Sequence, residues 1–296
     1  MFVDFHVHTC FSFDCKTSVV GVVKAAQRAG LDAIAITDHD TFEAIEKAKK
    51  IASRENVTII PGVEITAEGG THIVGLFINK LPRSKKLLEI IKEIKSLGGL
   101  TVLPHLYRSD TGLFYNWKKK HQFTTQEINK IMKLVDLIEV VNYKSILKEE
   151  RIPLDIIKNW GKPFIAGSDA HYSFEVGNVR TKVVGLTSKE IAKGSKEIYF
   201  YRKLATQKDK TQTIHSPLPL AVAKRIFFLG NYQEVIKKIS PPKILAILKS
   251  IKNYLTTLSE KRRNKDITTK DNLLKLVEED NKITIEPVIK NKNDTI

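Results

Sequence analysis

The 296-residue chain has few cysteines, a shortage of acidic residues and no long apolar segment. Its two cysteines, Cys10 and Cys15, are too few for a disulfide framework, so we expect reduced thiols. No apolar run approaches the roughly 18–20 residues that a membrane span needs. The opening MFVDFHVHTC has neither the basic nor the long apolar region of a secretory signal. These absences predict a cytoplasmic protein with no transmembrane segment.

The shortage of acidic residues leaves a formal charge of +16, and the surplus is uneven along the chain. Residues 203–257 contain ten Lys and Arg against two Asp and Glu, whereas residues 1–202 contain 30 against 23. A basic surplus attracts phosphate-bearing partners. The alternative is that lysine decorates solvated faces without any ligand, and the composition leaves both interpretations open.

Strand and helix patterns alternate through the first 200 residues. Continuous apolar strands such as AIAIT and LIEVV, separated by helical segments, are typical of a mainly parallel sheet buried on both faces. This pattern predicts an α/β fold of the (β/α) barrel type over residues 1–202, followed by a basic, mainly helical extension at 203–258 and a mobile tail at 259–296. The helix expected at Lys243–Leu258 has one apolar stripe. That stripe could dock on the barrel, pair with another subunit in an oligomer, or lie on an anionic membrane surface.

Polar residues gather at the carboxyl ends of the predicted strands, where barrels build their active sites. His6 and His8 lie two positions apart on one strand, so their imidazoles share a face and suit a divalent metal ion. Asp14 follows within reach, and further candidate ligands come at the ends of later strands. These are His39, Glu64, His72, His105, Asp169 and His171. Structural histidines would not gather at one end of so many strands, and mixed imidazole and carboxylate ligands suit Zn, Fe or Mn.

The segments that contain these residues resemble the successive motifs of the PHP (polymerase and histidinol phosphatase) family. They are HVHTCFSFD, ITDHD, PGVEI with THIVG, LPHL and GSDAH, and they span residues 1 to about 185 in the order of the family. The resemblance implies a distorted seven-stranded TIM-like barrel, (β/α)7, with a trinuclear Zn, Mn or Fe centre of the stand-alone phosphoesterase type. Pro104-His105-Leu106 departs from the Ala-His-Pro of many members, which affects the loop and keeps the histidine.

Carried over residue by residue, the resemblance fills all nine ligand positions. One ion would take His6, His8, Glu64 and Asp169, a second would share Glu64 and take His72 and His105, and a third would take Asp14, His39 and His171. We therefore expect two or three divalent ions as cofactors.

The expected reaction is hydrolysis of a phosphomonoester or nucleotide by a metal-bound hydroxide, because bound ions neutralise phosphate oxygens and lower the pKa of water. We expect Asp169, His171 and Arg108 to be catalytic, with Arg108 clamping phosphate, as Arg180 also could. One alternative is a 5′-to-3′ nuclease acting on RNA or DNA, which the basic segment and the predicted loop Ser109–Thr124 with Lys118–Lys120 would favour. A non-catalytic, metal-stabilised scaffold is the third possibility.

Overall fold

The computed structural model describes residues 1–147, 156, 159–201, 273–279 and 282–287. The basic extension predicted at 203–258, including Lys243–Leu258, lies outside the described residues. Among the residues that are described, no helix is both long and apolar enough to cross a membrane.

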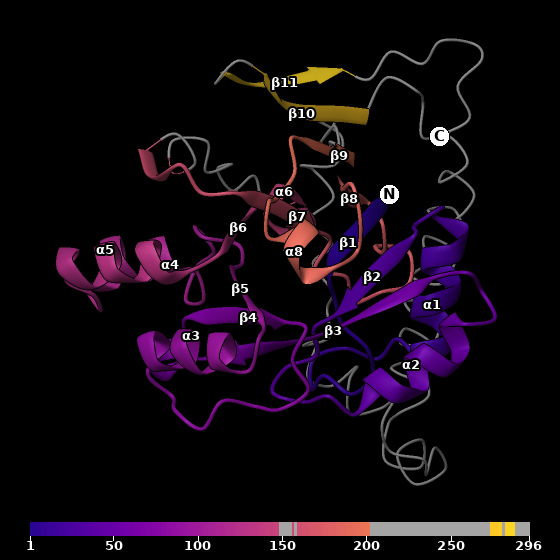
Figure 1. Ribbon diagram of the computed structural model, residues 1–296, viewed down its shortest axis with the longest axis horizontal. Coiled ribbons are helices and arrows are strands. Elements are labelled where there is room, and N and C mark those ends of the chain that lie inside the picture. Colours follow the sequence, from indigo (N-terminus) through magenta and orange to yellow (C-terminus); the bar gives the residue numbers. More distant parts are fainter. Residues whose placement is uncertain (148–155, 157–158, 202–272, 280–281, 288–296) are drawn as a thin grey trace, which may run out of the picture. The chain divides into compact units, whose positions relative to one another are not determined.

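Seven strands and their connecting helices alternate in the first part of the chain (Figure 1). In chain order the elements are β1 Phe2–Val7, α1 Val19–Arg28, β2 Ala33–Ile36, α2 Ala44–Ala52, β3 Thr58–Thr66, the 3-10 turn η1 Glu68–Gly70, β4 His72–Leu76, α3 Leu87–Ser96, β5 Leu100–Leu103, α4 Leu113–Lys120, α5 Thr125–Leu134, β6 Leu137–Asn142, α6 Tyr143–Leu147 and β7 Phe164–Gly167. They are followed by β8 Val179–Lys182, α8 Ser188–Ile191, β9 Glu197–Tyr201, β10 Leu273–Glu279 and β11 Lys282–Pro287.

Strands β1 to β7 pair in sequence order and form a barrel-shaped sheet. A single parallel bridge between Val7 and Ala170 joins β1 to the chain just after β7, where the His8 amide donates to the Ala170 carbonyl at 2.9 Å. Strand β4 runs antiparallel to both β3 and β5, which distorts the otherwise parallel barrel. The predicted distorted seven-stranded α/β barrel is confirmed.

The barrel interior is filled by apolar side chains, mostly small or branched, from all seven strands. Val3 and Phe5 of β1 belong to this interior cluster, although His6 on the same strand and His8 just after it belong to the polar site. An irregularity in the pairing of β1 with β2, between Asp4 and Val7, accounts for this change of face. The first half of the strand therefore contributes apolar side chains to the barrel interior, and its end contributes an imidazole to the polar site.

Helices cover the outside of the barrel and place the loops that carry the site. Figure 1 shows α1 and α2 side by side next to β1–β3, and their apolar faces share one core with Ile34 and Ile36. Ser18 caps α1 by accepting a hydrogen bond from the Gly21 amide. Gly30 ends the helical segment with a φ of 66°, as its position in the sequence predicts.

Three segments differ from the sequence-based expectation. The apolar run Thr58–Pro61 predicts a short strand, whereas β3 continues to Thr66, because β4 folds back against it and pairs with the extra residues. The predicted loop Ser109–Thr124 contains helix α4, on which the aromatic residues Phe114 and Trp117 pack into the core. Within the predicted tail, β10 and β11 form a hairpin that adds to the sheet through β9. The proposed limits of the three regions stay predictions.

Candidate metal centre

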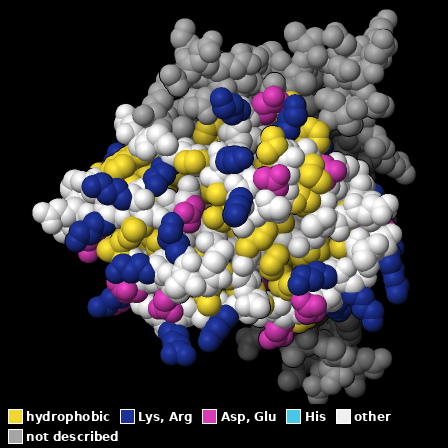
Figure 2. All heavy atoms as spheres, in the orientation of Figure 1, with side chains coloured by type: hydrophobic (Ala, Val, Ile, Leu, Met, Phe, Trp, Pro, Cys, Tyr) yellow, Lys and Arg dark blue, Asp and Glu magenta, His cyan; other side chains and the backbone are white. Residues whose placement is uncertain are grey.

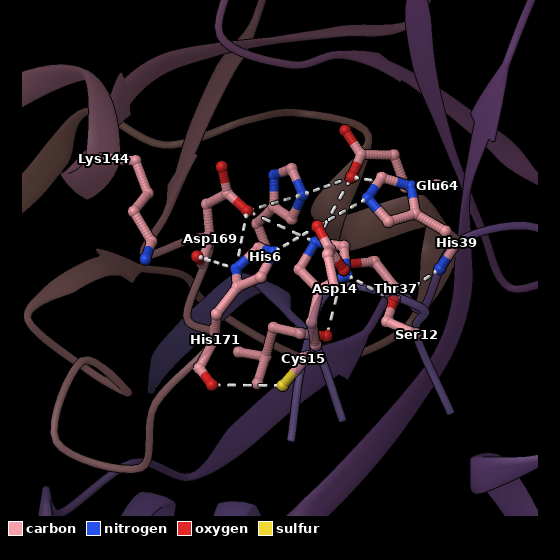
Figure 3. Close-up of polar contacts among 12 residues, drawn as sticks. His6, Ser12, Asp14, Cys15, Thr37, His39, Glu64, Lys144, Asp169 and His171 are labelled. Carbon is pink, nitrogen blue, oxygen red and sulfur yellow. Dashed lines mark hydrogen bonds and ion pairs between the residues drawn. The ribbon is translucent and has the colours of Figure 1, made fainter. Parts of the chain in front are cut away.

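The nine predicted ligands come together at one end of the barrel. Most follow the carboxyl ends of parallel strands, whereas His72 begins β4, which reaches the same end because it runs in the opposite direction. Figure 3 shows side chains from β1, its following loop, β3 and the segment after β7 pointing toward one another. Eight of the nine are buried or partly buried, and Asp14 lies nearest solvent. The fold thus gathers residues separated by up to 165 positions in sequence.

Glu64 lies at the centre of this group. Its carboxylate is buried, and each of its two oxygens faces a different set of imidazoles. Oε1 lies 2.8 Å from His72 Nδ1 and 3.0 Å from His105 Nε2, while Oε2 lies 3.2 Å from both His6 Nε2 and His8 Nε2 and 3.6 Å from His39 Nδ1. A carboxylate with this arrangement of neighbours can bridge two metal ions.

The donor atoms fall into three overlapping groups, in each of which they lie within 4.8 Å of one another. The groups are His6, His8, Glu64 and Asp169; His8, Asp14, His39 and His171; and His39, Glu64 and His72. The first equals one predicted ligand set, and the second adds His8 to another. His105 joins through its contact with Glu64.

Several of these atoms approach one another without forming hydrogen bonds. His8 Nε2 lies 3.2 Å from Glu64 and 3.3 Å from Asp169 Oδ1, yet it has no hydrogen-bond partner, and neither does His39 Nδ1. A buried polar atom without a partner is costly. Donor atoms that point toward a shared centre rather than along hydrogen-bond directions fit the coordination of cations, so the residues present suit divalent metal ions.

Neighbouring groups select the tautomer of two histidines and orient a third. His6 Nδ1 contacts Glu139 Oε1 at 3.0 Å, and His171 Nδ1 contacts the Asp169 carbonyl at 2.9 Å. Each partner accepts a proton from Nδ1 and leaves Nε2 free to bind a metal ion. His8 Nδ1 lies 2.9 Å from Ser12 Oγ, which leaves its Nε2 directed into the group.

The mixture of charges keeps the carboxylates ionised. Burial raises the pKa of Glu64, but the imidazoles of His6 and His72 outweigh it and hold this pKa well below its ordinary value. The pKa of Asp169 is lowered in the same way against burial, by His6 and by the guanidinium of Arg108. Anionic oxygens are the form that a metal ion requires.

The backbone is strained at two of these residues. His105 and Asp169 have φ values of 28° and 54°, a region that residues with a Cβ rarely adopt. Gly167, two positions before Asp169, lets β1 approach closely, since an added Cβ would lie 2.4 Å from the Cβ of His6. The local sequence thus permits a geometry that the barrel imposes around the centre.

Arg108 extends into the centre. Its Nη1 donates to Asp169 Oδ2 at 2.5 Å and its Nη2 donates to Asn142 Oδ1 at 2.7 Å, with only 15% of the side chain exposed. The three residues expected to be catalytic, Asp169, His171 and Arg108, are therefore adjacent. Arg180 lies elsewhere, because its guanidinium donates to the carbonyls of Gly177 and Ala29.

The basic triplet Lys118–Lys120 is part of helix α4 rather than a loop. Lys120 pairs with Asp110 at 2.6 Å, and the Lys118 ammonium lies 5.6 Å from the centre of the Trp117 ring. Phe114 on the same helix is buried. Phe114 and Trp117 of this helix thus pack against the core.

Several supporting residues, chiefly Glu139, carry no sequence motif that marks them. Its carboxylate is buried, and it accepts hydrogen bonds from the His105 amide at 2.8 Å and Asn142 Nδ2 at 2.9 Å in addition to its contact with His6. A lone glutamate inside the apolar strand LIEVV was the available signal. Glu175 is a second example, because its Oε2 accepts from the backbone amides of His171 and Tyr172.

Comparison with known proteins gives two adjoining matches to family models. The PHP domain matches residues 4–150, and the PHP-associated family matches residues 154–194. A structure of a two-domain protein from Bacteroides vulgatus, containing a predicted PHP-like metal-dependent phosphoesterase, shares the fold with a TM-score of 0.51 at 19% identity. That match covers 68% of this chain and 64% of the other.

Two curated relatives match shorter stretches of the chain. An uncharacterized protein of Methanocaldococcus jannaschii is 34% identical over 119 residues, which is 36% of this chain and 68% of the relative. A 5′-3′ exoribonuclease of Haemophilus influenzae is 36% identical over 96 residues, which is 31% of this chain and 35% of that enzyme.

Proposed function

The chain belongs to the PHP domain family, and from this premise we propose that it hydrolyses a phosphomonoester or a nucleotide at a trinuclear divalent-metal site. The observation that carries the proposal is the convergence of nine imidazole and carboxylate side chains on one barrel end. Several buried donor atoms of this group lack hydrogen-bond partners. A protein that binds no metal ion there would gain nothing from leaving them so.

We propose that the ligands divide into the three sets predicted from the sequence. Glu64 would be shared by two ions, one with His6, His8 and Asp169 and another with His72 and His105. Asp14, His39 and His171 would hold the third, near the solvent-facing side where Asp14 lies. Bound ions of this kind lower the pKa of coordinated water to about 7 and neutralise phosphate oxygens.

The chain's own residues would orient and bind the substrate. Arg108 Nη1 donates to Asp169 Oδ2, and its second amino group, Nη2, donates to Asn142 Oδ1. A guanidinium oriented by two partners can donate its remaining N–H groups to the oxygens of a phosphate beside the proposed ligands. Because the His171 side chain is 17% exposed, we propose that the ester reaches the site from the solvent next to His171.

The alternative is a 5′-to-3′ nuclease, and the match to the Haemophilus influenzae exoribonuclease favours it. On the face that Figure 2 shows, basic side chains are spread among acidic and apolar ones, so this face gives the nuclease no added support. The basic segment 203–257 lies outside the described residues. Both reactions break a phosphoester bond with the same ligand set, so substrate tests must separate them.

The test uses metal-stripped protein reloaded with Mn or Zn and offered four substrates. These are glycerol phosphate, a nucleoside monophosphate, a nucleoside bisphosphate and a 5′-phosphorylated oligonucleotide. We expect phosphate release from a small ester, and little activity in Asp169→Asn. Glu46→Gln is the control, because this side chain is 83% exposed on α2. Cleavage of the oligonucleotide alone would establish the nuclease, and no hydrolysis of any substrate would refute both reactions.

A further inference from the structure

Exposed aromatic side chains mark the mouth of the metal centre. Among the residues whose side chains the structure describes, three of Phe, Tyr and Trp are classed as exposed: Phe13 at 86%, Tyr172 at 55% and Phe174 at 45%. Phe13 immediately precedes Asp14, and Tyr172 immediately follows His171. Because Asp14 Oδ2 and His171 Nε2 are 2.8 Å apart, the two aromatic segments meet at one side of the centre.

Phe13 presents one face of its ring to solvent. The other face stacks on His39, with ring centres 4.8 Å apart and planes inclined by 28°. Tyr172 is less available, since it stacks on Phe174 at 5.3 Å and the Lys144 ammonium lies 5.5 Å from the centre of its ring. An apolar ring left in water beside a charged centre contributes little to folding, so its position calls for another explanation.

The backbone around Phe13 is firmly held. The Cys10 amide donates to the Thr17 carbonyl at 2.8 Å, and Thr17 Oγ1 donates to the His171 carbonyl at 2.8 Å. The Cys15 thiol donates to the same carbonyl at 3.1 Å, as Figure 3 shows. A ring on such a loop loses little conformational freedom when a ligand stacks on it.

We propose that Phe13 is the stacking platform for the nucleobase of the substrate, whose phosphate enters the adjoining metal centre. The inference rests on the proposed phosphoesterase function and makes its substrate class a nucleoside phosphate. Every nucleobase has a flat face that stacks on an aromatic ring, whereas a glycerol or sugar phosphate has none. The base can belong to a free nucleotide or to the terminal nucleotide of a strand, and both bring the same chemistry to Phe13.

The experiment compares Phe13→Leu with Phe13→Tyr in the metal-loaded full-length chain. Specificity is read as the ratio of kcat/KM for adenosine monophosphate to that for glycerol phosphate. Loss of base stacking is expected to lower this ratio about 5- to 150-fold in Phe13→Leu, mainly through KM. Phe13→Tyr should keep the ratio, and Val184→Ala, which truncates a side chain that is 83% exposed on the loop after β8, is the matched control.

An equal fall for both esters would overturn the inference, because it would mean that Phe13 only shields His39. An unchanged ratio in Phe13→Leu would overturn it too. A 5′-phosphorylated dinucleotide in the same assay distinguishes a strand terminus from a free nucleotide: the natural type of substrate is the one whose kcat/KM falls more in Phe13→Leu. Binding of adenosine by calorimetry tests the platform without turnover. If the wild type hydrolyses no ester, the proposed function fails. Weaker adenosine binding to Phe13→Leu than to Phe13→Tyr would still support Phe13 as a stacking platform. Equal binding to the two variants, or no binding at all, would refute the platform.

Discussion

Glu139→Gln is the substitution that tests most sharply how the chain orients its proposed metal ligands. The glutamate accepts three hydrogen bonds inside the barrel, on Oε2 from the His105 amide and Asn142 and on Oε1 from His6 Nδ1. Glutamine has the same shape but only one accepting oxygen. If that oxygen keeps the two bonds on the Oε2 side, its amino group must face His6.

Two donors cannot face each other, so His6 must then accept at Nδ1 and carry its proton on Nε2. That nitrogen is the one directed at Glu64, at 3.2 Å, and in this form it cannot bind a metal ion. Loss of a partner that orients a ligand typically lowers metal affinity about 10- to 100-fold, which is about 1.4–2.8 kcal/mol. The metal-free protein should also lose about 1–3 kcal/mol of unfolding free energy if the mismatch remains.

The assay is competition between metal-free protein and a chelator of known affinity for Zn or Mn, with circular dichroism as the check on folding. Glu46→Gln, exposed on α2, is the control and should bind like the wild type. Wild-type metal affinity in a folded Glu139→Gln protein would refute the reasoning, since it would mean that Glu139 does not fix the His6 tautomer.

Two further substitutions probe the geometry of the centre. Gly167→Ala should lower the free energy of unfolding by about 1–3 kcal/mol, because the added Cβ would lie 2.4 Å from the Cβ and 2.7 Å from the amide nitrogen of His6. Urea denaturation measures this loss, and an unchanged midpoint would contradict the prediction. Arg108→Lys cannot keep both hydrogen bonds, to Asp169 and Asn142, so we expect at least a tenfold lower kcat/KM with metal content retained. A variant with wild-type kcat/KM would remove Arg108 from the substrate site.

Much of this architecture could be predicted because its signals are local. The helix α1 follows from its apolar spacing, its Ser18 cap and Gly30, and the buried strands follow from continuous apolar runs. The prediction of a PHP-type phosphoester hydrolase with a barrel fold is confirmed by the comparisons. The ligand list rests on a different kind of pattern, in which polar residues recur at strand ends.

The remainder depended on contacts between distant segments. The extension of β3 to Thr66 requires β4 to fold back on it, which no local pattern in PGVEI specifies. Glu139 reads as an interruption of an apolar strand, and only the folded barrel shows that it faces His6, 133 positions away. Helix α4 was hidden by its mixture of aromatic and basic residues, whose packing against the core decides its conformation.

The metal content of the purified protein tests the central claim most directly. The account predicts two or three equivalents of Zn, Mn or Fe per chain by elemental analysis after mild purification. Truncation of one of the residues grouped around Glu64, as in His8→Ala, should lower that metal content in a protein that still folds. Less than one equivalent in the wild type, with no gain after incubation with Mn or Zn, would contradict the account.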